Sequence, residues 1–566
     1  MKEIKKFEEW PFKVPSIEKT KEKILEFTEE FKNAKDANEA IKIINRLNKF
    51  NDKFQNEITH VEVLYTLDTR NKKYEKAMNT LNEGLPLIQS AATLFIKAYL
   101  ESEFLPDLEK KYGTFLTKMY KYQLKAFDDR IIEELIEENK LTMEYDNVTA
   151  GIRVEYKGNI YNLPQMGKFL QDNDRKTRQE ASLCYYKALD EVKDKLEDIY
   201  DKLVKVRDKM AKKLGYKNYV ELGYIRMNRY DYNKDDVAKY REQINEVVTP
   251  IAAKLLKDQF KRTGIKNPEY YDMSLTFKDG NPTPLGTTSE KIEYAKKMYD
   301  ELSKETSDFF RFMAEHHLMD LEAKEGKVSG GYMTYFPVYE TPFIFSNFNN
   351  TAGDVDVLTH EFGHSFQAHM SKGIKVPEYR SPTMESCEIH SMSMEFFTHP
   401  YMFYFFDDPD KYKYQHLADS ISFLPYGVTV DHFQEWVYEN PSATKEERNK
   451  KWHDLELKYT PYKVECYKEN KYLMDGHRWL LQSHIFSSPF YYIDYTLAQV
   501  VAFEFFNLDR KNHELAWKRY VALCKLGGKY PFRTLVLKSH LKDPFEDGVV
   551  KQTIKPLLKE LKSYKI

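Results

Sequence analysis

Cysteine is scarce in the sequence, and no long apolar run is present. The 566 residues include only four cysteines, Cys184, Cys387, Cys466 and Cys524, and no C-x-x-C pair. In a chain of this length, scattered cysteines are most simply free thiols in a reducing compartment. The first fifteen residues lack the apolar core of a signal peptide, and no run of about 18 apolar residues follows. We therefore expect a cytoplasmic protein that does not cross a membrane.

The sequence also lacks an excess of charge of either sign. Lys and Arg number 87 against 89 Asp and Glu, which gives a formal net charge of −2. This balance gives no electrostatic footprint for nucleic acid or for an anionic membrane surface. Aromatic residues, by contrast, are abundant, with 42 Tyr and 36 Phe. They fit a bulky core, and they are also compatible with a tyrosine-lined cavity for a peptide-like ligand.

Most of the chain has the pattern of amphipathic helices. In "DANEAIKIINRLNKF", apolar residues recur at helical spacing, and Asp36 with Glu39 three residues later marks a helix start. Two stretches depart from this pattern. The first, "AGIRVEYKGNIYNL", alternates and then turns at Lys157-Gly158-Asn159, which predicts a hairpin near residues 150–163. The second, "SGGYMTYFPVYETPFIFSNF", favours a short sheet. The predicted fold class is therefore mainly α with a small β-sheet.

The stretch "VLTHEFGHSFQAHM" directly follows the predicted sheet and carries an HExxH motif. Residues four apart stack on one face of a helix, so His360 and His364 can bind one ion together. Glu361, one position further round, can flank that ion as a base without binding it. This is the arrangement in which two His hold zinc and the Glu takes a proton. The competing interpretation is a chance spacing of buried, hydrogen-bonded histidines.

A catalytic zinc needs a third protein ligand and an open position for water. Candidates lie in "SPTMESCEIHSMSMEFFTHP", which predicts a second helix. Glu388 and Glu395 share one face of it, and Glu385 lies one turn before Glu388. His390 points away from this face, and His399 precedes a proline at a predicted helix end.

These residues resemble a known family. "HEFGH" followed by "ESCEIHSMSMEFF" is similar to the thimet oligopeptidase and oligoendopeptidase F family of zinc metallopeptidases. "GGYMTYFPVYETPFIFSNFNNTAGDVDVLTHEFGHSFQ", "LQDNDRKTRQEA" and "HIFSSPFYYIDYTLAQ" resemble the oligoendopeptidase F branch. The blocks lie between roughly residues 150 and 500. The interval from His364 to Glu388 is about one residue shorter than in thimet oligopeptidase, which places the difference in the intervening loop.

The resemblance implies roles for individual residues. In the pattern E-x-x-S-x-x-x-E, it implies Glu388 as the third zinc ligand and Glu395 as the residue that orients an imidazole. From the C-terminal block it implies His484, Tyr495 and Tyr492 as groups that stabilise the reacting carbonyl. Tyr491 replaces Tyr492 if the alignment shifts by one residue.

The resemblance further implies two helical lobes around a deep channel that admits oligopeptides. We place residues 1–190 in an N-terminal helical lobe and residues 191–566 in a catalytic metallopeptidase domain. The expected function is a zinc-dependent endopeptidase with one Zn²⁺ per chain. Cobalt or manganese would suit the same ligands. The alternatives are a zinc carboxypeptidase or dipeptidyl carboxypeptidase on a similar scaffold, and a non-catalytic peptide-binding protein.

Overall fold

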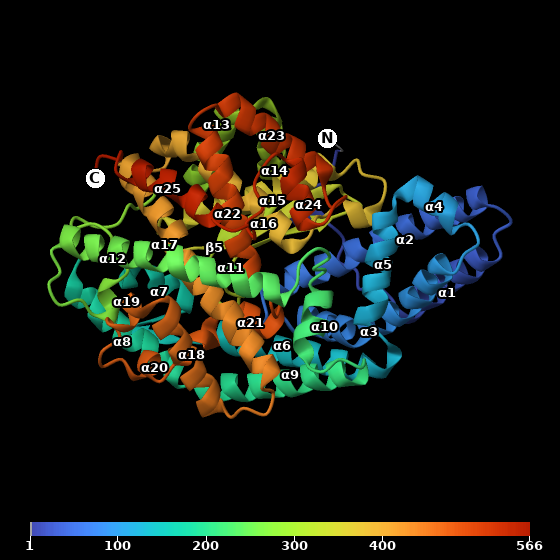
Figure 1. The fold of residues 1–566 in the computed structure, drawn as a ribbon, viewed down its shortest axis with the longest axis horizontal. Coiled ribbons are helices and arrows are strands. Elements are labelled where there is room, and N and C mark those ends of the chain that lie inside the picture. The colour runs from blue at the N-terminus through green and yellow to red at the C-terminus, as the bar shows by residue number, and fades with distance from the viewer. Residues whose placement is uncertain (1–2) are drawn as a thin grey trace.

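Helices make up most of the computed structural model, which describes residues 3–566 (Figure 1). Helices α1 to α5 form an arm that extends from one side of the molecule, blue in Figure 1. They have a hydrophobic core of their own, separate from the main one. The bounds of the arm helices are α1 Ile17–Lys32, α2 Ala37–Leu67, α3 Lys72–Leu100, α4 Leu105–Tyr112 and α5 Thr114–Ala126.

The start of α2 lies where the sequence predicts it. The carboxylate of Asp36 accepts a hydrogen bond from the Glu39 backbone N–H at 2.8 Å. In return, the Glu39 carboxylate accepts one from the Lys35 backbone N–H at 2.8 Å. These two bonds satisfy backbone donors that the first turn of a helix leaves free.

The body of the molecule consists of two groups of helices (Figure 1). The upper group in this view contains α13–α16 and α22–α25, and the lower group contains α6–α10 and α18–α21. The bounds up to α16 are α6 Ile132–Ala150, α7 Leu163–Leu170, α8 Arg175–Asp190, α9 Lys193–Lys213, α10 Tyr219–Arg226, α11 Lys234–Val247, α12 Thr249–Thr263, α13 Thr288–Leu302, α14 Lys304–Glu315, α15 Gly353–Ser371 and α16 Met384–Phe397.

The remaining α-helices are α17 Pro409–Glu439, α18 Lys445–Tyr459, α19 Pro461–Val464, α20 Lys471–Met474, α21 Ser483–Ser487, α22 Tyr492–Asp509, α23 His513–Leu526, α24 Phe532–Lys538 and α25 Val549–Leu561. Short 3₁₀ turns are η1 Phe7–Glu9, η2 Asp129–Ile131, η3 Tyr270–Asp272, η4 Pro377–Tyr379, η5 His399–Tyr404 and η6 His477–Leu481. Within residues 3–566, none of the helices combines the length and the apolar character needed to cross a bilayer.

Both predicted β-elements are present. Strands β1 (Val154–Tyr156) and β2 (Asn159–Tyr161) pair antiparallel. Lys157 and Gly158, which join them, have φ of 49° and 78°. Two successive left-handed residues match the twist of a tight hairpin, and they confirm the predicted turn.

The second sheet has the strand order β3-β5-β4, with β3 (Met319–Glu322) parallel and β4 (Tyr332–Phe336) antiparallel to β5 (Thr341–Phe348). It packs beside α15, as expected. The "PFIFSNF" segment could pair with an extended peptide only if it lay at an edge of the sheet, and it does not. That segment is β5, the central strand, because β3 occupies the side that the sequence pattern left open. The edge next to α15 belongs to β4.

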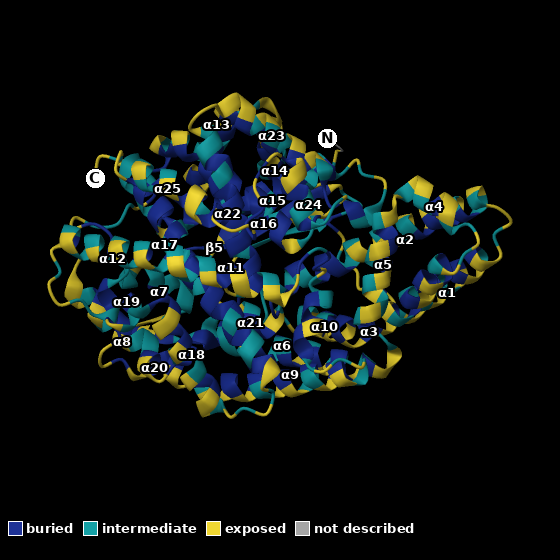
Figure 2. Ribbon diagram, viewed as in Figure 1, coloured by how far each residue is buried: buried dark blue, intermediate teal, exposed yellow. Residues whose placement is uncertain are grey.

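Three helices, α15, α16 and α22, meet in the most buried part of the body, dark blue in Figure 2. From Glu388 to Phe397, every residue of α16 is buried. α15 packs its apolar stripe of Leu358, Phe362 and Phe366 inward, and each of these side chains is fully buried. Phe362 meets Tyr299 of α13 at a ring separation of 4.0 Å. The site-bearing helices are thus fixed by packing on several sides.

The large hydrophobic core contains residues from both sides of the predicted domain boundary near residue 190. Asp190 is the last residue of α8, and the charged helix α9 follows. The division into residues 1–190 and 191–566 stays a prediction.

Gly363 sets the distance between α15 and α16. A Cβ on this residue would lie 2.6 Å from Ser391 Cα and 2.7 Å from the carbonyl oxygen of His390. Both atoms belong to the backbone of α16, so no side-chain rotation can relieve the overlap. The helices can approach this closely only because residue 363 has no side chain.

We expect Gly363→Ala to lower the free energy of unfolding by about 1–3 kcal/mol, the range for overpacked cores, although Ala is the better helix former. Denaturant titration measures this change. Gly373→Ala is the matched control, because a Cβ there meets no atom within 4 Å, and it should change stability by less than about 0.5 kcal/mol. Equal stability of the two variants would contradict the packing argument.

Candidate metal centre

Helix α15 presents two imidazoles to one side. His360 and His364 lie one turn apart, and their ring centroids are 5.0 Å apart. The start of the helix is fixed by Asp354, whose carboxylate accepts hydrogen bonds from the backbone N–H groups of Asn349 and Asn350 at 2.8 and 3.0 Å. The apolar stripe faces the opposite way into the core, so the His-bearing face cannot rotate away from the site.

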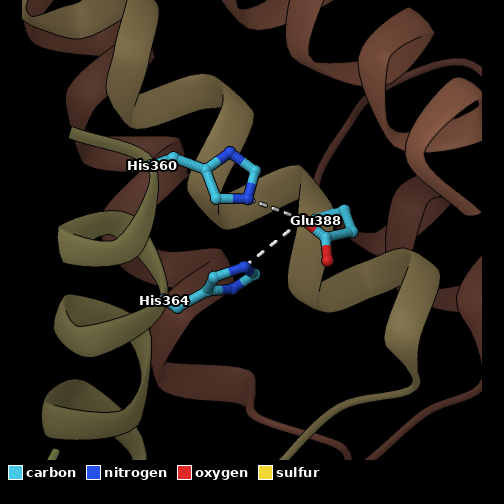
Figure 3. A group of neighbouring side chains, drawn as sticks. All are labelled: His360, His364 and Glu388. Carbon is cyan, nitrogen blue, oxygen red and sulfur yellow. Dashed lines mark ion pairs between the residues drawn. The ribbon is translucent and has the colours of Figure 1, made fainter. Parts of the chain in front are cut away.

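Glu388 of α16 brings a carboxylate between these imidazoles (Figure 3). Its Oε2 lies 3.1 Å from His360 Nε2 and 3.3 Å from His364 Nε2. One ligand atom from each of the three residues lies within 4.8 Å of the other two. The structure therefore brings together His360, His364 and Glu388, as the sequence predicted. They form a set of one carboxylate and two imidazole donors that could hold a metal ion.

Hydrogen bonds hold the Glu388 carboxylate in place. The Ser391 hydroxyl donates to Oε2 at 2.9 Å, and the Tyr491 hydroxyl donates to Oε1. Burial alone would raise the pKa of Glu388, but His364 and His360 lower it well below its usual value. The carboxylate is thus held ionised, which is the form that binds a metal.

Glu361 lies beside this group and differs from it in environment. Burial raises the pKa of its carboxyl, and the nearby His360 and His364 oppose the shift. Its Oε2 is buried and has no hydrogen-bond partner among the described residues. Gly331, at the start of β4, lies so close that a Cβ there would be 3.5 Å from Glu361 Oε1. Glu361 is therefore buried near His360 and His364 and is not one of the three candidate metal donors.

Glu395 contacts the other nitrogen of His360, as the resemblance implied. Its Oε1 lies 2.6 Å from His360 Nδ1, which leaves Nε2 directed at Glu388. The second oxygen of Glu395 lies 2.7 Å from His416 Nε2, and His416 Nδ1 lies 2.9 Å from His399 Nε2. A buried chain of hydrogen bonds thus runs from His360 into the core. A carboxylate behind a ligating imidazole fixes its orientation and tautomer.

The C-terminal candidates approach the same space from α21 and α22. His484 Nε2 lies 3.0 Å from the Tyr495 hydroxyl, and His484 Nδ1 lies 2.9 Å from Gln482 Nε2. In this arrangement Gln482 donates to Nδ1, so Nε2 carries the proton and donates to Tyr495. Burial lowers the pKa of His484 to about 4, and burial raises the pKa of Tyr495 well above its usual value. Both groups are therefore neutral hydrogen-bond donors.

Tyr491 and Tyr492 point to different places. Tyr491 reaches Glu388, and its ring lies 5.0 Å from that of Tyr495. Tyr492 packs against Phe423 and Tyr426, with ring separations of 5.7 and 5.8 Å. The sequence left open a shift of the alignment by one residue, from Tyr492 to Tyr491. Tyr491 is the tyrosine that contacts Glu388, a member of the triad.

A cavity of about 370 Å³ lies beside the site. Its walls come from α15, α16, α17, α22 and the segment that carries Gln482 and His484. We call it the active-site cavity, and its lining residues include Glu395, Tyr412, His416, Asp419, Ser420, Phe423, Gln482, His484, Tyr492 and Tyr495. The tyrosines among them agree with the expectation of a tyrosine-lined cavity.

The rival ligand candidates do not reach the three donors. Glu385 lies near Arg229, and burial raises its pKa to about 7. His390 is buried beside Tyr520, with ring centroids 6.4 Å apart. His399 bonds to His416. Sequence reasoning missed His416 and Gln482, which have no motif spacing of their own, because only the fold brings them to the site.

Two family models match the chain. Residues 7–127 match the Peptidase M3 N-terminal domain, and residues 168–553 match Peptidase family M3. An oligoendopeptidase F homologue of Borreliella burgdorferi is 24% identical over 384 residues, which are 65% of this chain and 62% of that relative's length.

Solved structures agree with this result. The chain is similar to Pz peptidase A, solved with an inhibitor, with a TM-score of 0.97, 44% identity and 99% of each chain covered. It is also similar to a Bacillus anthracis protein assigned to oligoendopeptidase F, with a TM-score of 0.92, 42% identity and 99% of each chain covered.

Proposed function

The chain belongs to peptidase family M3, and on this premise we propose that it is a zinc-dependent endopeptidase that hydrolyses internal bonds of oligopeptides. The observation that carries this proposal is the convergence of His360, His364 and Glu388 beside a cavity. Membership of a family does not by itself locate a hydrolytic site. Such a site requires metal ligands, here two imidazoles and a carboxylate, and a base beside them, here a glutamate without a hydrogen-bond partner.

The distances in the triad fit zinc. Two ligand atoms about 2.1 Å from a tetrahedral zinc lie about 3.4 Å apart. The observed separations of 3.1 and 3.3 Å between Glu388 Oε2 and the two imidazole nitrogens are close to that value. Three protein ligands also leave a fourth position for water. When bound, zinc would lower the pKa of that water to about 7 and polarise the scissile carbonyl.

The residues around the triad would handle protons and charge. Glu361 is placed to take a proton from the attacking water and to return it to the leaving amine. Its unpartnered oxygen and raised pKa suit this exchange. Tyr495 and His484 would donate hydrogen bonds to the negative charge that develops on the carbonyl oxygen. Tyr492 would contact the substrate from the wall of the cavity. The free edge of β4 is the better place for an extended peptide backbone to pair, since β5 is central.

An internally quenched peptide blocked at both ends tests the proposed reaction. An endopeptidase cuts it, whereas a carboxypeptidase or dipeptidyl carboxypeptidase needs a free C-terminus. We expect internal cleavage that a chelator abolishes and added zinc restores, followed by fluorescence and mass spectrometry. Bound zinc with no cleavage of any peptide pool would favour the non-catalytic peptide-binding protein instead.

The variants Glu361→Gln and His364→Ala distinguish the role of the base from the role of the metal ligands. Glu361→Gln should keep the metal and lower turnover by about 10²–10⁴-fold, because the amide cannot accept a proton. His364→Ala should lose both activity and metal, because one ligand is gone. Elemental analysis of the purified variants measures the metal, and the quenched peptide measures turnover. Near wild-type turnover of Glu361→Gln would rule out the assigned base.

Tyr495→Phe removes a single hydroxyl from the proposed donor pair. We expect kcat to fall about 100-fold with little change in KM, because the hydrogen bond matters only when charge develops on the carbonyl oxygen. Tyr74→Phe serves as the matched control, since Tyr74 belongs to α3 of the arm and does not line the active-site cavity. An increase in KM with unchanged kcat would instead assign Tyr495 to substrate binding.

A further inference from the structure

A second cavity of about 310 Å³ adjoins the active-site cavity. Both cavities are lined by Asp419 of α17. On the same helix, Ser420 and Phe423 face the active-site cavity, and Ala418 and Ser422 face the second one. One turn of α17 therefore separates them.

Positive charge dominates the lining of the second cavity, which we call the cationic cavity. Its ionisable basic residues are Arg262, Lys463 and Arg478, and its lining contains a single acid, Asp419. Burial raises the pKa of Asp419 to about 6, so this carboxyl is still mostly ionised at neutral pH and offsets part, but not all, of the charge of the three basic residues. The remaining wall is largely apolar and aromatic, with Ala252, Leu255, Leu256, Met273, Tyr270, Tyr414 and Tyr462.

Lys463 is the cation in this cavity that the fold does not use. Its ammonium makes no hydrogen bond and no ion pair within 4.0 Å among residues 3–566, and its nearest aromatic partner is Tyr426, with Nζ 6.0 Å from the ring centroid. Burial lowers its pKa to about 8, and Arg478 adds to this shift. The side chain is therefore still mostly charged at neutral pH. The carboxylates of Asp419 and Glu456 oppose the shift, but neither forms an ion pair with this ammonium within 4.0 Å.

The two arginines are held in place but keep donors free. Arg478 Nη1 lies 3.1 Å from the Tyr467 hydroxyl, and Glu456 lies behind it at 3.6 Å. Arg262 donates to the Tyr414 hydroxyl at 3.1 Å and to the Thr276 carbonyl oxygen at 2.9 Å. These contacts fix the guanidinium groups with charge still directed at the cavity.

A line of hydrogen bonds connects the cationic cavity to the proposed oxyanion donors. His484 bonds to Gln482, and Gln482 Oε1 accepts a hydrogen bond from the Tyr426 hydroxyl at 2.9 Å. The ring of Tyr426 then lies under the guanidinium of Arg478, at 4.7 Å from its centroid. The amide of Gln482 and the ring of Tyr426 thus connect His484 with Arg478.

We infer that the cationic cavity binds the C-terminal carboxylate of the peptide substrate, an inference that rests on the proposed peptidase function. Lys463 and Arg478 supply the charge and donors that a carboxylate requires. The apolar wall suits the side chain of the terminal residue, which a site for a free inorganic anion would not need. A peptide bound across α17 would then present an internal bond to the triad at a fixed number of residues from its end.

A matched pair of peptides tests this inference. The two peptides have one sequence and differ only in a free acid or an amide at the C-terminus. With wild-type enzyme, we expect the acid to be cleaved with a KM about 10-fold to 100-fold lower than the amide, the range for one charged hydrogen-bonded contact. Lys463→Met should bring the two KM values together, and Lys463→Glu should make the amide the better substrate. Lys463 is the residue to change because its removal leaves no buried partner unpaired.

Lys450→Met is the control, since that side chain is 75% exposed on α18 and should keep the wild-type preference. A thermal melt of each variant confirms folding. A third peptide, an amide with Glu as its last residue, distinguishes recognition of the terminal carboxylate from recognition of a side-chain carboxylate. If it is cleaved as well as the acid, the cavity reads an acidic side chain and the assignment to the terminus is overturned.

Binding to Glu361→Gln, measured by calorimetry, gives a readout that needs no cleavage. If this variant binds the acid peptide more tightly than the amide peptide, and the wild-type enzyme cleaves neither, the cationic site is retained and the peptidase proposal is rejected. Cleavage of both peptides with equal KM by wild-type enzyme would retain the peptidase and overturn the inference.

Discussion

The site depends on one buried carboxylate that two imidazoles share. Glu388 is almost completely buried, and a buried charge without partners would cost several kcal/mol. Its partners come from three segments, with His360 and His364 on α15, Ser391 on its own helix and Tyr491 before α22. All of these partners therefore stabilise the same buried carboxylate. The two imidazoles oppose the effect of burial and lower the pKa of this carboxyl well below its usual value.

The close contact of α15 with α16 makes this sharing possible. Gly363 lies between His360 and His364 in sequence and touches the backbone of α16. The same contact brings Ser391 and Glu388 to the level of the two imidazoles. On the far side of α16, the Tyr520 hydroxyl donates to the His390 carbonyl oxygen at 2.8 Å, which fixes the helix from behind. Packing thus determines the geometry of the donors before any ligand is present.

Local periodicity was enough to predict which candidate side chains share a face of one helix, whereas the choice of Glu388 as the third ligand came from the family resemblance. His360 and His364 share a face through their spacing of four, and Glu388 and Glu395 share one through their spacing of seven. The same reasoning could not place Tyr491. It precedes α22 and follows Phe490, whose φ of 69° is left-handed, so the helical period used for Tyr492 and Tyr495 does not extend to it. Gln434 and Arg229, which bond the backbone of Phe490, come from distant segments.

The strand order shows the same limit. The sequence pattern indicated a short sheet within Ser329–Phe348, but the parallel partner β3 lies outside that stretch and makes β5 central. Parallel pairing with a segment before the hairpin leaves no mark in the alternation of β5, since a strand buried on both faces is apolar throughout. Only the fold determines which edge remains free.

The net charge also does not predict how charges are arranged inside the protein. The near balance of 87 basic and 89 acidic residues gives no sign of an excess of either charge, and it does not describe the interior. Most buried charges are paired, as Arg229 is with Asp494 at 2.7 Å and Arg207 with Glu138 at 2.6 Å. Lys463, which is half-buried beside two arginines, forms no ion pair within 4.0 Å among the described residues. A half-buried cation that forms no ion pair within the described fold is available to a ligand that supplies an anion.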